Sequence, residues 1–212
     1  MAGATAFVIL GGSIAPFLAP PAVRFEQDRT NVAAFTGFAP QQLDVVTGRL
    51  LADLVLWQGD FAITIDGAAV LSETERAHMR DVRKVFTGLW IVVFAGLAVL
   101  AAGFRGARGA GSEARAAAWR SVASGARALA VVIAVAGVFA VVAFDAAFEV
   151  FHRLFFSAGS YTFDPAHDRL VQLFPEQFWS EIAIAVGVVV IVVAIATAVL
   201  AGRRAKHLEV GA

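Results

Sequence analysis

Four long apolar runs separated by polar segments dominate the hydropathy pattern of the chain. They cover residues 4–23, 86–104, 128–148 and 182–201. Each run is close to the ~20 residues that an α-helix needs to cross the hydrocarbon core of a bilayer. The pattern predicts an all-α integral membrane protein with four transmembrane helices, forming a single membrane domain over residues 1–212.

The first run has an alternative interpretation as a cleaved signal peptide. It lacks the basic flank of such a peptide, however, and Pro16, Pro20 and Pro21 crowd its far end. A retained helix that the prolines break at the outer interface fits these features better.

The polar loop 24–85 contains secondary-structure signals of its own. Apolar residues recur every three or four positions between Pro40 and Trp57, which predicts a short amphipathic helix. The residues that carry this period are Leu43, Val46, Leu50 and Leu54. An Asp-Gly dipeptide within residues 61–71 suits the tight turn of a hairpin. Ser72 and Glu75 have capping-box spacing, so a helix should start there and continue into the second apolar run.

Charge asymmetry predicts the orientation in the membrane. Residues 105–127 carry five arginines and one acid, and the C-terminal tail adds three further basic residues. Residues 145–181 carry two arginines against six acids. By the positive-inside rule the basic segments are cytoplasmic. We therefore expect both termini and loop 105–127 in the cytoplasm, with loops 24–85 and 149–181 on the outer side.

The overall composition excludes several classes of function. The net charge is zero, which gives no support to nucleic-acid binding. The chain contains no cysteine, so disulfides, thiolate metal sites and a cysteine nucleophile are excluded. No cofactor is expected.

Two of the four histidines are the strongest candidates for chemistry. His78 lies eight residues before the second apolar run, and His152 lies four residues after the third. Both imidazoles should stand near the outer headgroup region, where a neighbouring carboxylate can orient each ring. Asp81 is a plausible partner for His78, and Asp164 or Asp168 for His152.

Simpler interpretations compete with this one. An interfacial histidine can contact lipid headgroups, the aromatic-rich stretch 148–179 can be an interfacial belt, and Asp164 can belong to a turn. Asp145 and Glu149 are costly at the end of the third run and point to a cavity or a partner, which keeps a transporter under consideration.

A His/carboxylate metal site is a further competitor, although no HxxxH or HExxH spacing supports it. Neither outer-loop serine, at 157 or 160, lies in a G-x-S-x-G elbow.

Two segments of the sequence resemble motifs of a known family. Glu75-xx-His78-xx-Asp81-Val82-Arg83 resembles the first motif of the lipoprotein intramolecular transacylases (Lit). The second is Phe151-His152-xx-Phe155-Phe156 followed by Phe163-Asp164-Pro165-xx-Asp168-x-Leu170-xx-Leu173-Phe174-Pro175-xx-Phe178-Trp179. The four-span layout agrees as well, so the resemblance covers nearly the whole chain. Tyr161 departs from it, because a Trp is expected there.

The resemblance implies an enzyme of the bacterial cytoplasmic membrane with its active site on the outer face. Its substrate would be a lipoprotein whose N-terminal cysteine carries a diacylglyceryl group, and membrane phospholipid would surround it. The sn-2 acyl chain would move to the free α-amine, giving the lyso form. A lipid- or lipoprotein-binding protein without catalysis is the alternative, and a metal-dependent lipid enzyme is another.

The resemblance also implies residue roles. His78 and His152 would carry the activity. From the chemistry of the residues we assign His78 as the base and His152 as the acid or carbonyl polariser, or the reverse. Arg83 or Arg153 would stabilise the oxyanion, and Glu75 would support the site. The aromatic residues expected to hold acyl chains are Phe151, Phe155, Phe156, Tyr161, Phe163 and Trp179.

Overall fold

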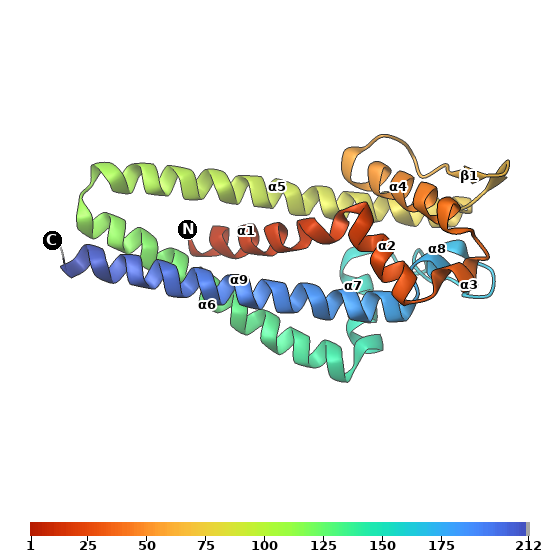
Figure 1. Cartoon of the computed structure of the whole chain (residues 1–212). Helices are drawn as coiled ribbons and strands as arrows, with labels where there is room; N and C mark the ends of the chain where they lie inside the picture. The colour runs from red at the N-terminus through yellow and green to blue at the C-terminus, as the bar shows by residue number, and fades with distance from the viewer. Residues whose placement is uncertain (211–212) are drawn as a thin grey trace. The chain divides into compact units, whose positions relative to one another are not determined.

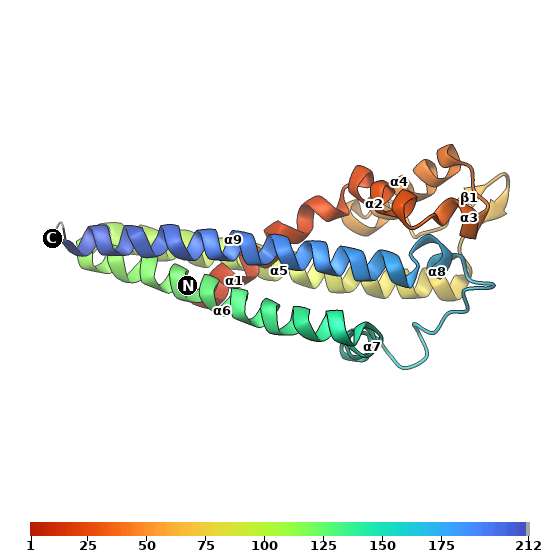
Figure 2. The ribbon, with the colours of Figure 1, turned by 60° about the horizontal axis from the view of Figure 1, so that its bottom comes forward.

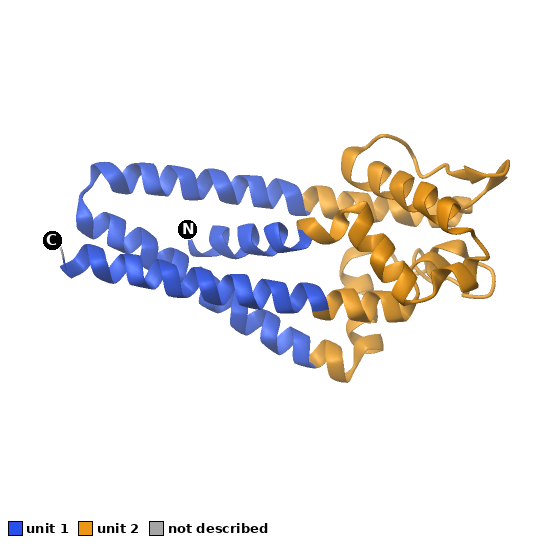
Figure 3. Cartoon of the chain, in the orientation of Figure 1, with its two compact units in different colours: residues 1–14, 89–138, 185–212 blue, residues 15–88, 139–184 orange. Residues whose placement is uncertain are grey.

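The computed structural model describes residues 1–210 and is almost entirely helical (Figure 1). The elements are α1 (Ala2–Ile14), a 3-10 turn (Ala15–Leu18), α2 (Pro20–Arg29), α3 (Val32–Thr36), α4 (Pro40–Leu56), β1 (Thr64–Ile65), β2 (Ala68–Ala69), α5 (Glu73–Gly109), α6 (Ser112–Val142), α7 (Phe144–Phe155), α8 (Arg169–Leu173) and α9 (Glu176–Val210). The chain forms two compact units, shown in Figure 3. Unit 1 contains residues 1–14, 89–138 and 185–212, and unit 2 contains residues 15–88 and 139–184.

The helices confirm the predicted class of an all-α membrane protein. Within the described chain, α5, α6 and α9 are each long and apolar enough to cross a bilayer. The bent segment from Ala2 to Arg29 makes a fourth crossing if its two arms are counted together.

The first apolar run is not the single helix predicted over residues 4–23. Helix α1 ends at Ile14, a 3-10 turn follows, and the chain bends by 67° before α2. The prolines explain the break, since Pro16 lacks a backbone donor and Pro20 starts a new helix as its first residue. Val23 therefore lies in α2 and is buried in the core of unit 2.

The third apolar run also ends earlier than predicted. Helix α6 stops at Val142, and Ala143 has non-helical angles of φ −143° and ψ 62°. Residues 144–155 form the separate helix α7, whose axis crosses that of the first turns of α9 (Figures 1 and 2). If α6 continued straight, Asp145 and Glu149 would lie on an apolar helix, where charged side chains are costly. Helix α7 is amphipathic, so its polar face accommodates both acids.

The basic segment 105–127 is helical, and not the loop that was predicted. Helix α5 extends to Gly109 and α6 begins at Ser112, so only residues 110–111 connect them. Gly111 makes the turn with φ of +95°. Alanine and arginine are strong helix formers, which explains why both helices continue through this segment.

Unit 1 is held together by close packing of small residues. Helix α1 packs against α5 at Gly96, where a β-carbon would lie 3.1 Å from the Ala4 carbonyl oxygen. It packs against α6 at Gly125, whose backbone comes so close to Ala2 that no side chain fits. Ile9 of α1 joins a buried cluster with residues of α6 and α9. Small residues allow such approach between membrane helices, which have little hydrophobic driving force to associate.

Unit 2 has a conventional hydrophobic core, and several predictions for it are confirmed. The four periodic residues of α4 (Leu43, Val46, Leu50 and Leu54) are buried together with Phe61 and with Leu173 of α8. The predicted hairpin is present as β1 and β2, paired antiparallel with Thr64 opposite Ala69. Helix α5 starts directly after Ser72, as the capping box predicted.

Candidate active site

Unit 2 brings the two candidate histidines together. His78 lies in the second turn of α5 and His152 lies near the end of α7. Their ring centroids are 6.1 Å apart and the ring planes differ by 18°. Each of the two residues is buried in the described structure, with 7% of its surface exposed. The pairing that the sequence suggested is therefore present in the fold.

Aromatic rings enclose the two imidazoles. Phe156 contacts both, with centroid distances of 4.8 Å to His78 and 5.4 Å to His152. Phe163 lies 5.5 Å from His78, and Tyr161 lies 5.0 Å from His152. Three predicted acyl-binding residues thus line the histidine pair. Such an enclosure lowers the local dielectric and strengthens electrostatic interactions inside it.

The backbone of α7 determines the tautomer of His152. Nδ1 of His152 lies 2.8 Å from the carbonyl oxygen of Phe148, one turn earlier on the same helix. A carbonyl oxygen only accepts hydrogen bonds, so Nδ1 carries the proton in this contact. The lone pair of neutral His152 is then on Nε2, which suits a general base.

His78 is held in its neutral form. Burial lowers the pKa of His78 from 6.5 to about 4, and the nearby His152 acts in the same direction. The Asp81 carboxylate and the Ser160 backbone act in the opposite direction but do not compensate. Its Nδ1 is buried and has no hydrogen-bond partner among residues 1–210. A buried nitrogen without a partner is costly, which makes Nδ1 a candidate contact for a substrate.

Glu75 connects the two sequence motifs. Its carboxylate is 2% exposed and accepts hydrogen bonds from the backbone N–H of Ser72 and of Leu170, both at 2.6 Å. The Ser72 hydroxyl in turn accepts from the Glu75 backbone, which completes the predicted capping box. Glu75 thereby joins the start of α5 to the backbone at the start of α8, and within the described chain its carboxylate forms no hydrogen bond with an imidazole.

Within the described chain, the carboxylates of Asp81, Asp164 and Asp168 form no hydrogen bond with His78 or His152, although the charge of Asp81 acts on the pKa of His78. Asp81 accepts from Lys84 at 2.7 Å. Asp164 pairs with the exposed His167 at 2.8 Å, and Asp168 accepts from the Asp164 backbone at 2.7 Å. Asp164 and Asp168 stabilise the turn after Phe163, because short polar side chains readily bond the nearby backbone. The carbonyl of Phe148 takes the orienting role at His152.

Both candidate arginines are engaged away from the imidazoles. Arg83 donates to the carbonyl oxygens of Gly59 and Asp53, and its guanidinium lies 4.6 Å from the ring centroid of Trp57. Arg153 pairs with Glu149 at 2.6 Å, one turn earlier on α7. None of the hydrogen bonds of the described chain joins either arginine to a histidine. The geometry gives no support to an oxyanion role for either.

The remaining aromatic candidates, Phe151, Phe155 and Trp179, are more exposed than the rings that enclose the histidine pair. Phe151 contacts His152 with a centroid distance of 5.4 Å and is itself 45% exposed. Phe155 packs on Phe151 and is 52% exposed. Trp179 packs on Phe174 and Phe178 of the α8–α9 segment. The exposed pair on α7 therefore presents an apolar surface beside the site.

Two contributors escaped the sequence prediction. Phe148 supplies both the carbonyl for His152 and a ring 4.1 Å from its imidazole. Its position four residues before His152 on a helix was a usable signal. The Leu170 backbone, which binds Glu75 from 95 residues away, had no local signal.

The metal alternative finds no support in the geometry. Between Met1 and Val210, no group of three or more histidine, aspartate or glutamate side chains lies close enough to hold a metal ion.

Comparison with known proteins identifies the family. No curated protein sequence matched the chain. Among solved structures, the membrane-integral lipoprotein intramolecular transacylase Lit from Bacillus cereus is similar, with a TM-score of 0.75, 19% identity, and coverage of 98% of this chain and 92% of that chain. A variant of that protein with a histidine replaced by arginine matches with a TM-score of 0.75 and 18% identity, over 100% of this chain and 91% of its own. The family model for lipoprotein intramolecular transacylase Lit matches residues 1–179. The chain therefore belongs to the lipoprotein intramolecular transacylase (Lit) family.

Proposed function

We propose that this protein is a transacylase that converts a diacylated lipoprotein to its lyso form. The acyl chain at the sn-2 position of the diacylglyceryl-modified cysteine moves to the α-amine of the same cysteine. The observation that carries the proposal is the buried, near-parallel pair His78 and His152 in a chain of this family. Membership of the family supplies the reaction, and the imidazole pair supplies groups able to perform it.

The reaction needs one proton to be moved and one carbonyl to be polarised. The amine nitrogen attacks the ester carbonyl carbon, and Nε2 of His152 takes the proton that the nitrogen loses. Collapse of the tetrahedral intermediate breaks the bond between that carbon and the glycerol oxygen. His152 then returns the proton to this oxygen, so no water or cofactor is consumed.

His78 would stabilise the intermediate as a neutral imidazole. Its low pKa makes it a poor proton acceptor, and its unpartnered Nδ1 is available to the substrate. Donation to the oxyanion that forms from the carbonyl requires the Nδ1–H tautomer, in which the other ring nitrogen of His78 gives up its hydrogen bond to the Ser160 backbone. This assignment reverses our first one, in which His78 was the base, because the Phe148 contact supports Nε2 of His152 as the acceptor.

No protein nucleophile is required. Amine and ester belong to one molecule, so holding them in contact supplies much of the rate enhancement. The Ser160 hydroxyl donates to the carbonyl oxygen of Ser157, and not to either imidazole. The exposed rings of Phe151 and Phe155 on α7 would contact the acyl chains.

The charge distribution supports an orientation with the histidines on the outer side. Unit 1 carries eight Lys and Arg residues against two acids, whereas unit 2 carries nine against fifteen. Basic ends of membrane helices remain in the cytoplasm. We therefore propose cytoplasmic termini and an outward-facing site, in a bacterial cytoplasmic membrane.

Tandem mass spectrometry of a reporter lipoprotein tests the function. The reporter is expressed with and without this protein, in a host that cannot N-acylate lipoproteins. Intact mass does not change on intramolecular transfer, so fragment ions must locate the acyl chain. We expect the chain on the α-amine with the wild-type protein, a free amine with His78→Ala or His152→Ala, and full transfer with the exposed control His167→Ala. A free amine in every sample, with expression confirmed, would replace this proposal with a non-catalytic lipid-binding role.

A further inference from the structure

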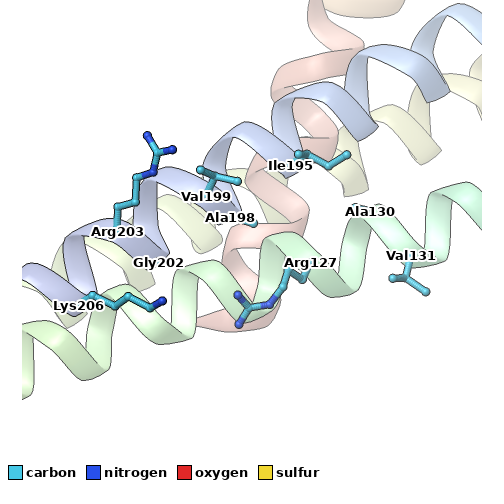
Figure 4. A pocket seen from close by; sticks show the side chains of 9 residues that line it. All are labelled: Arg127, Ala130, Val131, Ile195, Ala198, Val199, Gly202, Arg203 and Lys206. Atoms are coloured by element: carbon cyan, nitrogen blue, oxygen red, sulfur yellow. The ribbon is translucent and has the colours of Figure 1, made fainter.

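A groove of about 500 Å³ lies in unit 1 between α6 and α9 (Figure 4). Helix α6 contributes Arg127, Ala130 and Val131 to its lining. Helix α9 contributes the face that runs from Ile195 to Lys206. None of the residues of the histidine site lines it, so the groove is a separate feature of the chain.

One part of the groove is apolar and shaped by small residues. Ala130, Ala198 and Gly202 line it without long side chains, which leaves a channel between the two helices. Val131 and Ile195 border the channel and are 63% and 53% exposed. Such exposed aliphatic side chains on membrane-spanning helices face lipid tails, so the channel suits an acyl chain.

The other part of the groove is positively charged. Arg127, Arg203 and Lys206 line it, and no carboxylate does. In Figure 4 the charged ends of Arg127 and Lys206 turn toward each other across the groove. Arg203 precedes Lys206 by three residues, which is about one helical turn. The described ion pairs include none of these three side chains, whereas neighbouring Arg120 pairs with Glu209.

Neither of the two acids of unit 1 is available to neutralise the basic side chains of the groove. Glu209, one of its two acids, is engaged by Arg120. The other, Glu113, lies 14 residues before Arg127 on α6, which is about 21 Å along the helix. An anion from outside the chain is therefore the complementary partner.

We propose that this groove binds an anionic glycerophospholipid. The phosphate lies between Arg127 and Lys206, whose charged ends face each other in Figure 4, and an acyl chain lies along the channel lined by the small residues. Guanidinium groups bind phosphate in a bidentate manner, and basic pockets between membrane helices bind anionic headgroups. A soluble phosphate compound would leave the apolar channel unfilled, so the two parts of the groove together favour a lipid. The site is distinct from the proposed transacylase chemistry and does not depend on it.

Native mass spectrometry of the full chain in mild detergent tests the site. The probes are phosphatidylglycerol and phosphatidylcholine with identical acyl chains. We expect wild-type protein to retain phosphatidylglycerol preferentially. Each cation near a headgroup contributes about fivefold to binding, so Arg127→Gln combined with Lys206→Gln should reduce retention by more than about tenfold.

A matched control keeps the change in charge constant. Arg105→Gln combined with Arg108→Gln removes two cations from the end of α5, outside the groove. This pair should retain phosphatidylglycerol as the wild type does. Gly202→Leu should block the channel without changing charge, because a β-carbon there has open space, and it tests the site even if the charge variant fails to fold.

Three results would overturn the proposal. The first is equal retention of the two lipids by the wild type. The second is an equal loss in the groove variant and in the control, which would mean only a general effect of charge. The third is displacement of the lipid by glycerol phosphate at equal concentration, which would make the site one for a free phosphate.

Discussion

The carboxylate of Glu75 accepts a hydrogen bond of 2.6 Å from the backbone N–H of Leu170, joining positions 95 residues apart. Glu75 lies one turn before His78 on α5, and Leu170 follows the loop that carries Tyr161 and Phe163. This single contact therefore ties one histidine to the aromatic loop that encloses it. Because the carboxylate also binds Ser72, both of its oxygens are used.

Replacing Glu75 with Gln should loosen this connection. An amide keeps one acceptor oxygen but places an NH₂ group against a backbone donor. We expect a loss of about 1–3 kcal/mol in stability and about a tenfold or greater fall in transacylation, since the histidine pair loses its alignment. Thermal unfolding in detergent and the lipoprotein assay measure the two effects. Glu73→Gln is the control, because Glu73 is exposed on the same helix and bonds only surface arginines. Equal effects of the two substitutions would contradict the positioning role.

The low pKa of His78 predicts how stability depends on pH. The group is neutral in the folded chain down to about pH 4, whereas its ordinary pKa of 6.5 applies on unfolding. The unfolded chain therefore binds more protons between these values, and the free energy of unfolding falls as pH drops from about 6.5 to about 4. Above pH 6.5 this group has no effect.

Thermal unfolding at several pH values checks the prediction. His78→Gln removes the titrating group, so its melting temperature should decline less steeply between pH 6.5 and 4 than that of the wild type. Parallel curves for the two proteins would show that His78 is not buried in its neutral form.

Phe156 should control the environment of both imidazoles. Phe156→Ala removes the ring that contacts His78 and His152 and admits water to the pair. We expect activity to fall by about tenfold or more, because catalytic groups in a wet and loosened site lose their alignment. The pKa of His78 should rise toward its ordinary value as its burial is relieved. Activity measured across pH checks both effects, with Phe35→Ala, an exposed phenylalanine of α3, as the control. An unchanged rate and pH profile would contradict the enclosure.

Arg83 should act on stability and not on chemistry. Arg83→Gln removes the hydrogen bonds to Gly59 and Asp53 and the contact of its guanidinium with the Trp57 ring. We expect a loss of about 1–3 kcal/mol in stability, with the rate per folded molecule retained. Unfolding and transacylation measured on the same preparation separate the two. A large fall in rate at unchanged stability would restore the oxyanion role that the sequence suggested.

Helix packing in unit 1 predicts opposite effects for two glycines of α6. Gly125→Ala would drive a β-carbon into the Ala2 backbone, whereas Gly137→Ala has open space. We expect the first to destabilise by about 1–3 kcal/mol or more and the second to be neutral or to stabilise by up to about 1 kcal/mol. Melting temperatures of the two variants check this. A stable Gly125→Ala protein would mean that α1 does not approach α6 closely.

The sequence by itself determined the features that depend on neighbours along the chain. The membrane-length apolar runs, the buried face of α4, the hairpin at Asp66–Gly67 and the capping box at Ser72 each have a local signal. Periodicity, turn chemistry and capping act within a few residues, so they can be read without the fold. The motifs also identified His78 and His152 as the candidate pair.

Only the tertiary structure decided what surrounds that pair. Glu75 bonds a backbone donor 95 residues away, and Arg83 binds a loop 24 residues earlier, where sequence reasoning had placed it near the reaction. The aspartates expected at the histidines bond donors within four residues along the chain instead, namely the Lys84 and His167 side chains and the backbone at Asp164 and Ala166. Burial, which sets the charge of His78, is a property of the whole packed unit. No local pattern in the chain encodes it.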